Sequence, residues 1–410
     1  MQARTLAIDF GTSNTAAGYM ANGVPKLLEI ESSNTTLPTS IFFDFDARKA
    51  LFGTPANAAL ITGEYGRFMR ALKSVLGTSI MHEKRRIMDE QIDFIEIISR
   101  FLREIKTRAE AASGLRFDKA LSGRPVHFHS DDPKKDAQAL ADLRACYLKA
   151  GFSDVDFMFE PDAAALANHS HLPQGTIGLI VDIGGGTSDF TIFETLESGI
   201  NIRASHGVRV GGTDFDRKLS IDHIMPLLGK GSQIRKAFGD ETMTAPNAIF
   251  HNLATWQKIP FMYTGETRRE ASELLKYAAE PQRLKRLKET LEHELGHDLA
   301  FAAERGKIAA NKADATIDLS VLEPHLSAPL SQAALGHSLQ ALTSRIQTAA
   351  ADTLSQASLA PAQIDSLIFV GGSSLMAVVE ATLQAQFPTA KPHRTSAFTA
   401  VIEGLTLATA

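Results

Sequence analysis

Apolar residues recur along the chain with two different periods, that of a strand and that of a helix. The change of period indicates where strands end and helices begin. Residues 4–31 alternate between apolar and polar side chains, which is typical of strands, with a turn at Asn22-Gly23. Between residues 89 and 112, apolar residues recur at helical spacing, and Gly114 ends the pattern. The pattern then predicts a strand at 120–128, a helix at 137–150, and a strand at 157–159 followed by an Ala-rich helix.

The same order of strands followed by helices begins again at Leu179. The second half continues with strands to about residue 209, a charged helix at 281–305 and a strand at 364–370. We therefore expect an α/β fold of two lobes. The expected divisions are lobe I at residues 1–174 with a small subdomain at about 35–115, lobe II at residues 175–396 with a small subdomain and insertion at about 217–312, and a final helix at 397–410 that packs back toward the lobe interface.

Two short segments carry one pattern twice: an apolar strand, an Asp, and a turn of Gly, Thr and Ser. Asp9 precedes Gly11-Thr12-Ser13-Asn14, and Asp182 precedes Gly184-Gly185-Gly186-Thr187. Such turns expose backbone N–H groups and hydroxyls that hold phosphate oxygens, and a nearby carboxylate can hold Mg²⁺ through its waters. Each segment alone is equally typical of a β-hairpin turn. Their repetition favours a two-lobed nucleotide-binding enzyme in which the two turns bind a phosphate from opposite sides.

Composition narrows the class of protein further. The 410 residues are 44% hydrophobic and 22% charged, which is typical of a soluble globular protein. The net charge of −5 indicates neither nucleic acid nor an anionic membrane as a partner. The single cysteine, Cys146, excludes an internal disulfide framework, and its helical surroundings predict a buried, inert thiol. With no secretory pattern at the start and no apolar run of membrane-spanning length, we expect a cytoplasmic protein.

Further motifs follow the first Asp turn along the chain. They are Glu160-Pro161-Asp162-Ala163-Ala164-Ala165, the second Asp turn, Gly211-Gly212-Thr213-Asp214-Phe215-Asp216, Glu304-Arg305-Gly306-Lys307 and Val370-Gly371-Gly372-Ser373. In this order the motifs resemble the nucleotide-binding domain of the seventy-kilodalton heat-shock (Hsp70) chaperones over essentially the whole chain. The resemblance implies an actin-like ATPase fold, with two lobes that are each built on a duplicated ribonuclease-H-like βββαβα unit and a nucleotide cleft between them. It also implies a shorter relative that consists of the ATPase domain alone, without the family's peptide-binding β-sandwich and helical lid.

The resemblance also implies roles for the matching residues in binding ATP or ADP with Mg²⁺. Asp9 and Asp182 would hold Mg²⁺ through water, and Pro125 would couple the site to rotation of the lobes. The catalytic residues would be Lys73, which orients the attacking water, with Glu160, Asp182 and Thr187. The phosphates would be bound around Asp9, Gly11, Thr12, Ser13, Asn14, Gly184, Gly185, Gly186, Thr187, Gly211 and Gly212. The nucleoside would lie against Glu304, Lys307, Ile308, Gly371, Gly372, Ser373 and Leu375.

The chain departs from the family's pattern at several positions. Ile308 and Leu375 stand where the family stacks adenine between two arginines, so the stack would lack cation–π support. Phe398 replaces an acidic residue near the nucleoside. Asp156 aligns with the arginine that binds J-domain cochaperones and has the opposite charge, so we expect no conventional J-domain coupling. About fifty additional residues, around 225–277, enlarge the small subdomain of lobe II.

His293-Glu294-Leu295-Gly296-His297 matches the zinc-protease pattern His-Glu-x-x-His, whose two histidines share one helix face. However, a glycine interrupts the pattern, and no further ligand follows at the spacing that metzincin proteases use. The same helix also leads directly into Glu304-Arg305-Gly306-Lys307. These observations favour an ordinary helix over a protease site, with adventitious zinc binding as an alternative.

The sequence is compatible with three functions. The first is an ATP-binding, slowly hydrolysing chaperone-like protein that acts on a protein client or partner. The second is a nucleotide-dependent scaffold or pseudo-ATPase with little turnover, which the altered adenine pocket suggests. The third is a small-molecule kinase of the same superfamily. The motifs favour the first.

Overall fold

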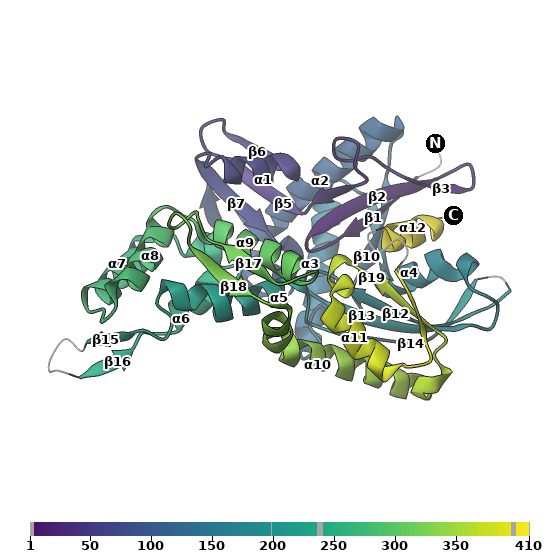
Figure 1. The fold of residues 1–410 in the computed structure, drawn as a ribbon. Helices are drawn as coiled ribbons and strands as arrows, with labels where there is room; N and C mark the ends of the chain where they lie inside the picture. The colour runs from purple at the N-terminus through teal and green to yellow at the C-terminus, as the bar shows by residue number, and fades with distance from the viewer. Residues whose placement is uncertain (1–3, 198, 236–240, 395–398, 410) are drawn as a thin grey trace. The chain divides into compact units, whose positions relative to one another are not determined.

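The computed structural model describes residues 4–197, 199–235, 241–394 and 399–409. The chain divides into two compact units, one of residues 1–212 with 343–410 and one of residues 213–342. The first unit contains both of the large sheets (Figure 1). None of the helices in the described ranges is long and apolar enough to cross a membrane.

The first large sheet has the strand order β11-β10-β1-β2-β3, with β4 paired to β2. β1 runs antiparallel to β2 and parallel to β10, β2 runs antiparallel to β3, and β10 runs parallel to β11. The strands are β1 (Thr5–Phe10), β2 (Asn14–Ala21), β3 (Val24–Leu27), β4 (Thr36–Pro38), β10 (Lys119–Arg124) and β11 (Asp154–Phe159).

The second large sheet has the order β14-β13-β12-β19-β20. Its strands are β12 (Ile177–Ile183), β13 (Ser188–Thr195), β14 (Ile200–Val208), β19 (Ser366–Val370) and β20 (Lys391–His393). β12 runs antiparallel to β13 and parallel to β19, so its neighbours repeat those of β1 in both order and direction. This repetition agrees with the duplicated unit that the resemblance implies.

Two helices, α4 (Glu160–Asn168) and α12 (Ala400–Leu407), pack against each other in the core of the first unit (Figure 1). Their apolar side chains join one buried cluster with residues of both sheets, such as Ala7 and Ile180. The contact is unusually close, because a Cβ on Gly404 would lie 1.7 Å from the carbonyl oxygen of Ala163. The predicted final helix at 397–410 is found at α12; residues 397, 398 and 410 lie outside the described residues.

Two of the remaining helices of this unit, α2 (Phe94–Ser113) and α3 (Pro133–Ala150), begin and end at residues with clear capping chemistry. Asp93 and Asp132 cap α2 and α3 through their carboxylates, and Gly114 and Gly151 end them in the left-handed conformation. Cys146 is buried on α3, and this burial raises the pKa of its thiol, which agrees with an inert residue. The helices are α1 (Thr54–Ile61), α2 (Phe94–Ser113), α3 (Pro133–Ala150), α11 (Ala377–Gln386) and the 3₁₀ turns η1 (Leu72–Val75), η2 (Ser79–His82), η3 (His169–His171), η7 (Pro361–Gln363) and η8 (Gly372–Leu375).

A small sheet and a hairpin lie within residues 35–115. The sheet has the order β6-β5-β7, and β8 pairs with β9. Their bounds are β5 (Ser40–Asp44), β6 (Lys49–Phe52), β7 (Gly66–Arg70), β8 (Arg85–Ile87) and β9 (Glu90–Ile92). The loop after β7 carries Lys73 on η1.

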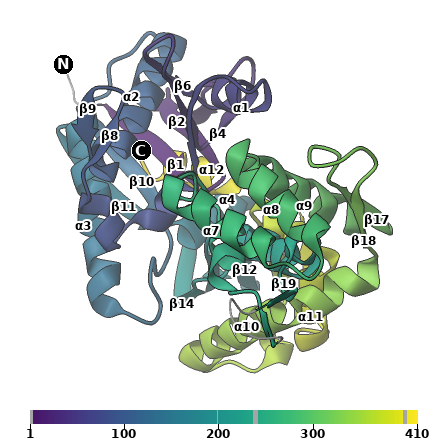
Figure 2. The same ribbon diagram turned by 90° about the vertical axis from the view of Figure 1, so that its left-hand side faces the viewer.

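The second unit is mainly helical, and α7 packs on α8 within it (Figure 2). The predicted single helix at 281–305 is wrong, because α8 ends at Glu292 and α9 begins at Gly296. The elements are η4 (Ser220–Ile224, a π-helical turn), η5 (Met225–Leu228), β15 (Gln233–Arg235), β16 (Thr242–Thr244), α6 (Ala248–Leu253), η6 (Ile259–Phe261), α7 (Gly265–Lys276), α8 (Pro281–Glu292), α9 (Gly296–Ala310), β17 (Ala315–Asp318) and β18 (Ser327–Leu330). The division between the units falls within two helices, α5 (Gly212–Leu219) and α10 (Gln332–Ala357).

The additional residues around 225–277 form a small core together with α9. Trp256 and Ile259 are buried against Ala300 of α9, and the Trp256 ring lies 5.1 Å from that of Phe301, measured between centroids. The hydroxyl of Tyr263 accepts a hydrogen bond from Gly296 N–H at 3.1 Å. The inserted segment is thus anchored on the start of α9.

Candidate functional site

Both Asp–Gly–Thr turns connect antiparallel strands. Asp9 pairs with Ala16 across β1 and β2, and Asp182 pairs with Asp189 across β12 and β13. The Gly184 N–H donates to the Thr187 carbonyl at 3.0 Å, which closes the second turn tightly. The hairpin interpretation and the phosphate interpretation of these segments are therefore compatible, since one turn can serve both purposes.

The two turns lie against each other inside the first unit. A Cβ on Gly185 would lie 2.6 Å from Ser13 Oγ and 3.0 Å from Thr12 Cβ. A Cβ on Gly211 would lie 2.4 Å from the Gly186 nitrogen. At Gly211 the clash is with backbone atoms, so only glycine fits there, and this glycine packs directly on the second turn.

The glycines that follow β14 and β19 of the second sheet join the same cluster. The Gly212 N–H donates to the Gly184 carbonyl at 2.9 Å, and a Cβ on Gly212 would lie 2.3 Å from Ser373 Oγ. Gly371 has φ +79, and a Cβ there would lie 2.9 Å from Asp182 Oδ1. The structure therefore brings the predicted residues at 11–14, 184–187, 211–212 and 371–373 together.

Lys73 and Glu160 form a buried ion pair at the same place. Lys73 Nζ contacts Glu160 Oε1, and the two side chains are 7% and 11% exposed. Lys73 lies on η1, two residues after Ala71, which has φ +57, and Glu160 is the first residue of α4. Because a buried ammonium without a partner would be costly, the Glu160 carboxylate stabilises Lys73 and holds its side chain in position.

A cavity of about 30 Å³, which has room for ordered water, lies beside this pair. No group in the described part of the chain hydrogen-bonds to the buried Ser74 Oγ, which borders the cavity. The cavity is lined by Thr12, Lys73, Ser74, Leu76, Pro125, Phe128, His129, Gly186, Thr187 and Arg209.

Carboxylates are crowded next to the cavity. Burial, with the nearby charge of Glu160, raises the pKa of Asp9 to about 7, and the same causes raise that of Asp189 to about 7. Burial and the charges of Glu160, Asp189 and Asp9 also raise the pKa of Asp182 well above its usual value. Such crowding is relieved by a bound cation. Within the described ranges, no three His, Cys, Asp or Glu side chains are placed to hold a metal ion directly.

The residues predicted to contact the nucleoside are divided between the units. Gly371, Gly372, Ser373 and Leu375 lie at η8 of the first unit, whereas Glu304, Lys307 and Ile308 lie on α9 of the second. Within the second unit, Lys307 Nζ pairs with Asp216 Oδ1 at 2.7 Å, and both are buried. Phe398 lies outside the described residues, and Asp156 is exposed on β11.

Four residues of this site were not predicted from the sequence. Asp189 follows the second Gly-Thr-Ser turn directly, so its position in the repeated pattern could have indicated it. Its Oδ1 accepts a hydrogen bond from Val126 N–H at 2.7 Å, which links the two sheets. Ser74 adjoins Lys73, but His129 and Arg209 carry no pattern that distinguishes them from other polar residues.

The His-Glu-x-x-His segment does not form one helix face. Residues 293–295 lie between α8 and α9, and Glu294 has φ +56. Arg268 of α7 donates to the Leu291 carbonyl at 3.2 Å and to Glu294 Oε1 at 2.9 Å. The segment is a helix-to-helix turn held by the inserted residues, so the helical spacing on which the zinc-protease pattern depends is absent.

Replacing Glu294 by Gly should raise the free energy of unfolding by about 1 kcal/mol, because glycine adopts this left-handed conformation without strain. Urea unfolding would measure the change. Glu294→Gln would measure separately how much the exposed ion pair with Arg268 contributes to the free energy of unfolding. Glu292→Gly, in the last turn of α8, is the matched control and should lower stability. Equal destabilisation by Glu294→Gly and Glu292→Gly would contradict the assigned turn.

The paired sheets, with an Asp–Gly–Thr turn at the same place in each, define an actin-like ATPase fold. The sequence model of the family described as "Hsp70 protein" matches residues 5–243 and 272–404, so the chain belongs to the Hsp70 family. Chaperone protein DnaK of Endomicrobium trichonymphae is 32% identical over 232 residues, which are 54% of this chain and 35% of that protein. The chain thus matches about a third of the length of this relative. The family and the fold that the sequence motifs predict are confirmed, and residues 244–271, which the family model leaves unmatched, fall inside the predicted insertion.

Proposed function

We propose that this chain binds ATP and ADP with Mg²⁺ and hydrolyses ATP slowly, as a chaperone-like protein that acts with a protein client or partner. The observation that carries the proposal is the buried Lys73–Glu160 pair beside a cavity walled by both glycine turns. Membership of the Hsp70 family, whose members work with client proteins, supports it. The client and the partner are inferred from the family relation alone. The single buried cysteine supports a reducing compartment, such as the cytoplasm.

The proposed chemistry follows from the arrangement of donors. Phosphoryl transfer requires positioning and stabilisation of charge rather than covalent participation of the protein. The N–H groups of residues 184–186 and the hydroxyls of Thr12 and Thr187 would bind phosphate oxygens. Lys73, held by Glu160, would orient the attacking water and stabilise the charge that develops. Mg²⁺, when bound, would neutralise phosphate charge, with Asp9 and Asp182 holding its waters.

A second candidate function is a nucleotide-dependent scaffold with little turnover. Ile308 on α9 is apolar and 53% exposed, and Leu375 is the apolar residue at the other predicted adenine position. A guanidinium at either place would add stacking with the base, which neither aliphatic side chain supplies. Weak or unselective binding of the base would favour this function.

The experiment that tests the proposal is titration with Mg-ATP and Mg-ADP by calorimetry, with phosphate release followed in the same samples. Binding with slow release supports the ATPase. Binding without release favours the scaffold, and phosphate transfer to an added sugar instead of water would indicate a kinase. Absence of binding to either nucleotide overturns both nucleotide-dependent functions.

Replacing Asp182 by Asn should weaken the magnesium-dependent part of ATP affinity by about 10- to 100-fold, since the carboxylate holds the ion through water. Calorimetry with Mg²⁺ and with excess EDTA would separate this part from binding of the free nucleotide. Asp46→Asn, at an exposed position, is the matched control and should change neither value. Equal affinities of Asp182→Asn and wild type in Mg²⁺ would rule out the assigned role.

A further inference from the structure

A chain of hydrogen bonds connects the segment that carries Lys73 with the segment that precedes Gly211. Arg209 Nη2 donates to the Ser74 carbonyl at 2.9 Å, and Arg209 Nη1 lies 2.8 Å from His129 Nδ1. His129 Nε2 lies 2.7 Å from the Leu76 carbonyl oxygen. Both side chains border the same cavity as Lys73, so the bridge lies next to the proposed reaction centre.

The partners determine the protonation state of the His129 ring. A carbonyl oxygen only accepts, so Nε2 must carry the hydrogen, and a guanidinium only donates, so Nδ1 must offer its lone pair. His129 is therefore neutral when the bridge is intact. A proton on Nδ1 would remove the acceptor for Arg209 and place two positive charges in contact.

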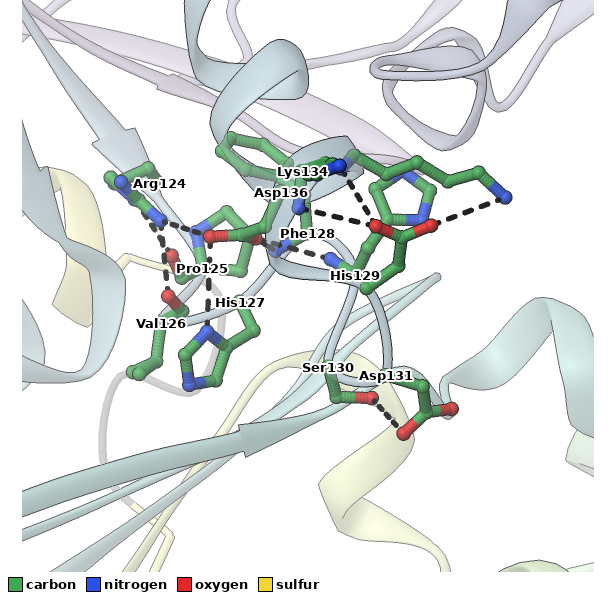
Figure 3. A network of polar contacts seen from close by, with 12 residues as sticks. Arg124, Pro125, Val126, His127, Phe128, His129, Ser130, Asp131, Lys134 and Asp136 are labelled. Atoms are coloured by element: carbon green, nitrogen blue, oxygen red, sulfur yellow. Dashed lines mark hydrogen bonds and ion pairs between the residues drawn. The ribbon is translucent and has the colours of Figure 1, made fainter.

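The backbone around His129 is itself held in place. Asp136 Oδ1 accepts hydrogen bonds from Phe128 N–H at 2.6 Å and His129 N–H at 3.2 Å. Figure 3 shows Arg124 and His127 turned toward the same carboxylate, at 3.6 Å and 3.8 Å. His129 is 8% exposed, so its ring has few alternative positions.

We propose that Arg209 and His129 are positioning residues for ATP hydrolysis: they hold residues 73–76 against the glycine turn, and protonation of His129 Nδ1 releases them. This inference rests on the proposed function. Arg209 and His129 are neither predicted metal ligands nor predicted nucleoside residues, so we expect the bridge to affect turnover more than nucleotide affinity. A displacement of about 1 Å at a reacting group can lower a rate by about a hundredfold.

Burial of the ring, its hydrogen bond and the charged groups around it determine the pH at which the bridge opens. Burial is the largest effect and lowers the pKa of His129, while the hydrogen bond to Leu76 raises it; Arg209 and Lys135 lower it and Asp136 raises it. Asp132, at the start of α3, also faces the ring. Since the net pKa is below the ordinary value, the ring is neutral at pH 7. Turnover should therefore fall only as the pH drops below the usual histidine range.

The first test separates rate from affinity. Arg209→Met and His129→Phe should each lower single-turnover hydrolysis of bound ATP by about 10- to 100-fold and change the Kd of Mg-ADP by less than about twofold. The amide of His129→Gln can donate to Leu76 and accept from Arg209. This variant should therefore hydrolyse ATP at the wild-type rate at neutral pH and should not lose rate at acid pH. His127→Gln, which is two residues away, is the control, and its rate of hydrolysis should still fall at acid pH. Unchanged rates in both Arg209→Met and His129→Phe would overturn the proposal.

A second set of measurements tests the bridge without nucleotide, independently of whether the protein hydrolyses ATP. In nucleotide-free wild-type protein, the nitrogen chemical shifts of the His129 ring should show that Nε2 carries the hydrogen. In nucleotide-free Arg209→Met, the rate of amide hydrogen exchange at residues 74–78 should increase. If the wild type hydrolyses no ATP, the proposed function fails, whereas these two readouts still decide whether the bridge exists. A hydrogen on Nδ1, or unchanged exchange in Arg209→Met, would show that the bridge is absent.

Discussion

Replacing Lys73 by Ala or Met should lower ATP hydrolysis by about 10²- to 10³-fold and leave Mg-ADP affinity nearly unchanged. The ammonium is buried against Glu160 at the cavity shared by both turns, so its charge acts where the phosphate would develop negative charge. Single-turnover hydrolysis and calorimetry on the same preparations would measure the two quantities. Lys84→Ala, at an exposed position in the same subdomain, is the control.

Removal of Lys73 also leaves Glu160 buried without its cation, which costs about 3–5 kcal/mol of stability. The double variant Lys73→Met with Glu160→Gln removes both charges and should recover much of that loss without recovering turnover. Thermal unfolding would verify that the variants are folded. Loss of nucleotide binding in a folded Lys73 variant, with the rate of the bound fraction intact, would show that the assigned role is wrong.

Replacing Gly404 by Ala should lower the free energy of unfolding by about 3 kcal/mol or more, the upper end of the usual cost of overpacking. The new Cβ would lie 1.7 Å from the Ala163 carbonyl oxygen, and this backbone atom cannot move unless α4 and α12 separate. Thermal unfolding followed by circular dichroism would show a lower midpoint.

Gly336→Ala is the matched control, because no atom lies within 4 Å of a Cβ at this position of α10. There the substitution should be neutral or raise the free energy of unfolding by up to about 1 kcal/mol, through helix propensity. If both variants unfold at the same temperature, α4 and α12 are not in the contact described.

The repeated strand–Asp–turn pattern was enough to predict two lobes with a similar order of elements and to place Asp9 and Asp182 at equivalent turns, whereas the duplicated sheet unit came from the family resemblance. This succeeded because strand alternation and a glycine turn are local properties, visible in a few consecutive residues. The family motifs added the distant partners Lys73 and Glu160, which are 87 residues apart and which no local pattern connects.

Other features could not be predicted because they depend on tertiary contacts. Arg209 and His129 are 80 residues apart, and nothing near either residue indicates that they meet. The break between α8 and α9 follows from contacts made by Arg268 and Tyr263 of the inserted segment, whereas the local spacing favours a continuous helix. The subdomain boundaries and the roles of the nucleoside residues stay predictions.

The chain has one tryptophan, Trp256, and the position of this residue provides an optical probe. The indole is buried in the core of the inserted residues, near the rings of Phe301 and His297. All of these residues belong to the second unit, so tryptophan emission reports on that unit, whereas circular dichroism reports on the whole chain. Comparing the two signals during unfolding would reveal whether the two units melt together or one after the other.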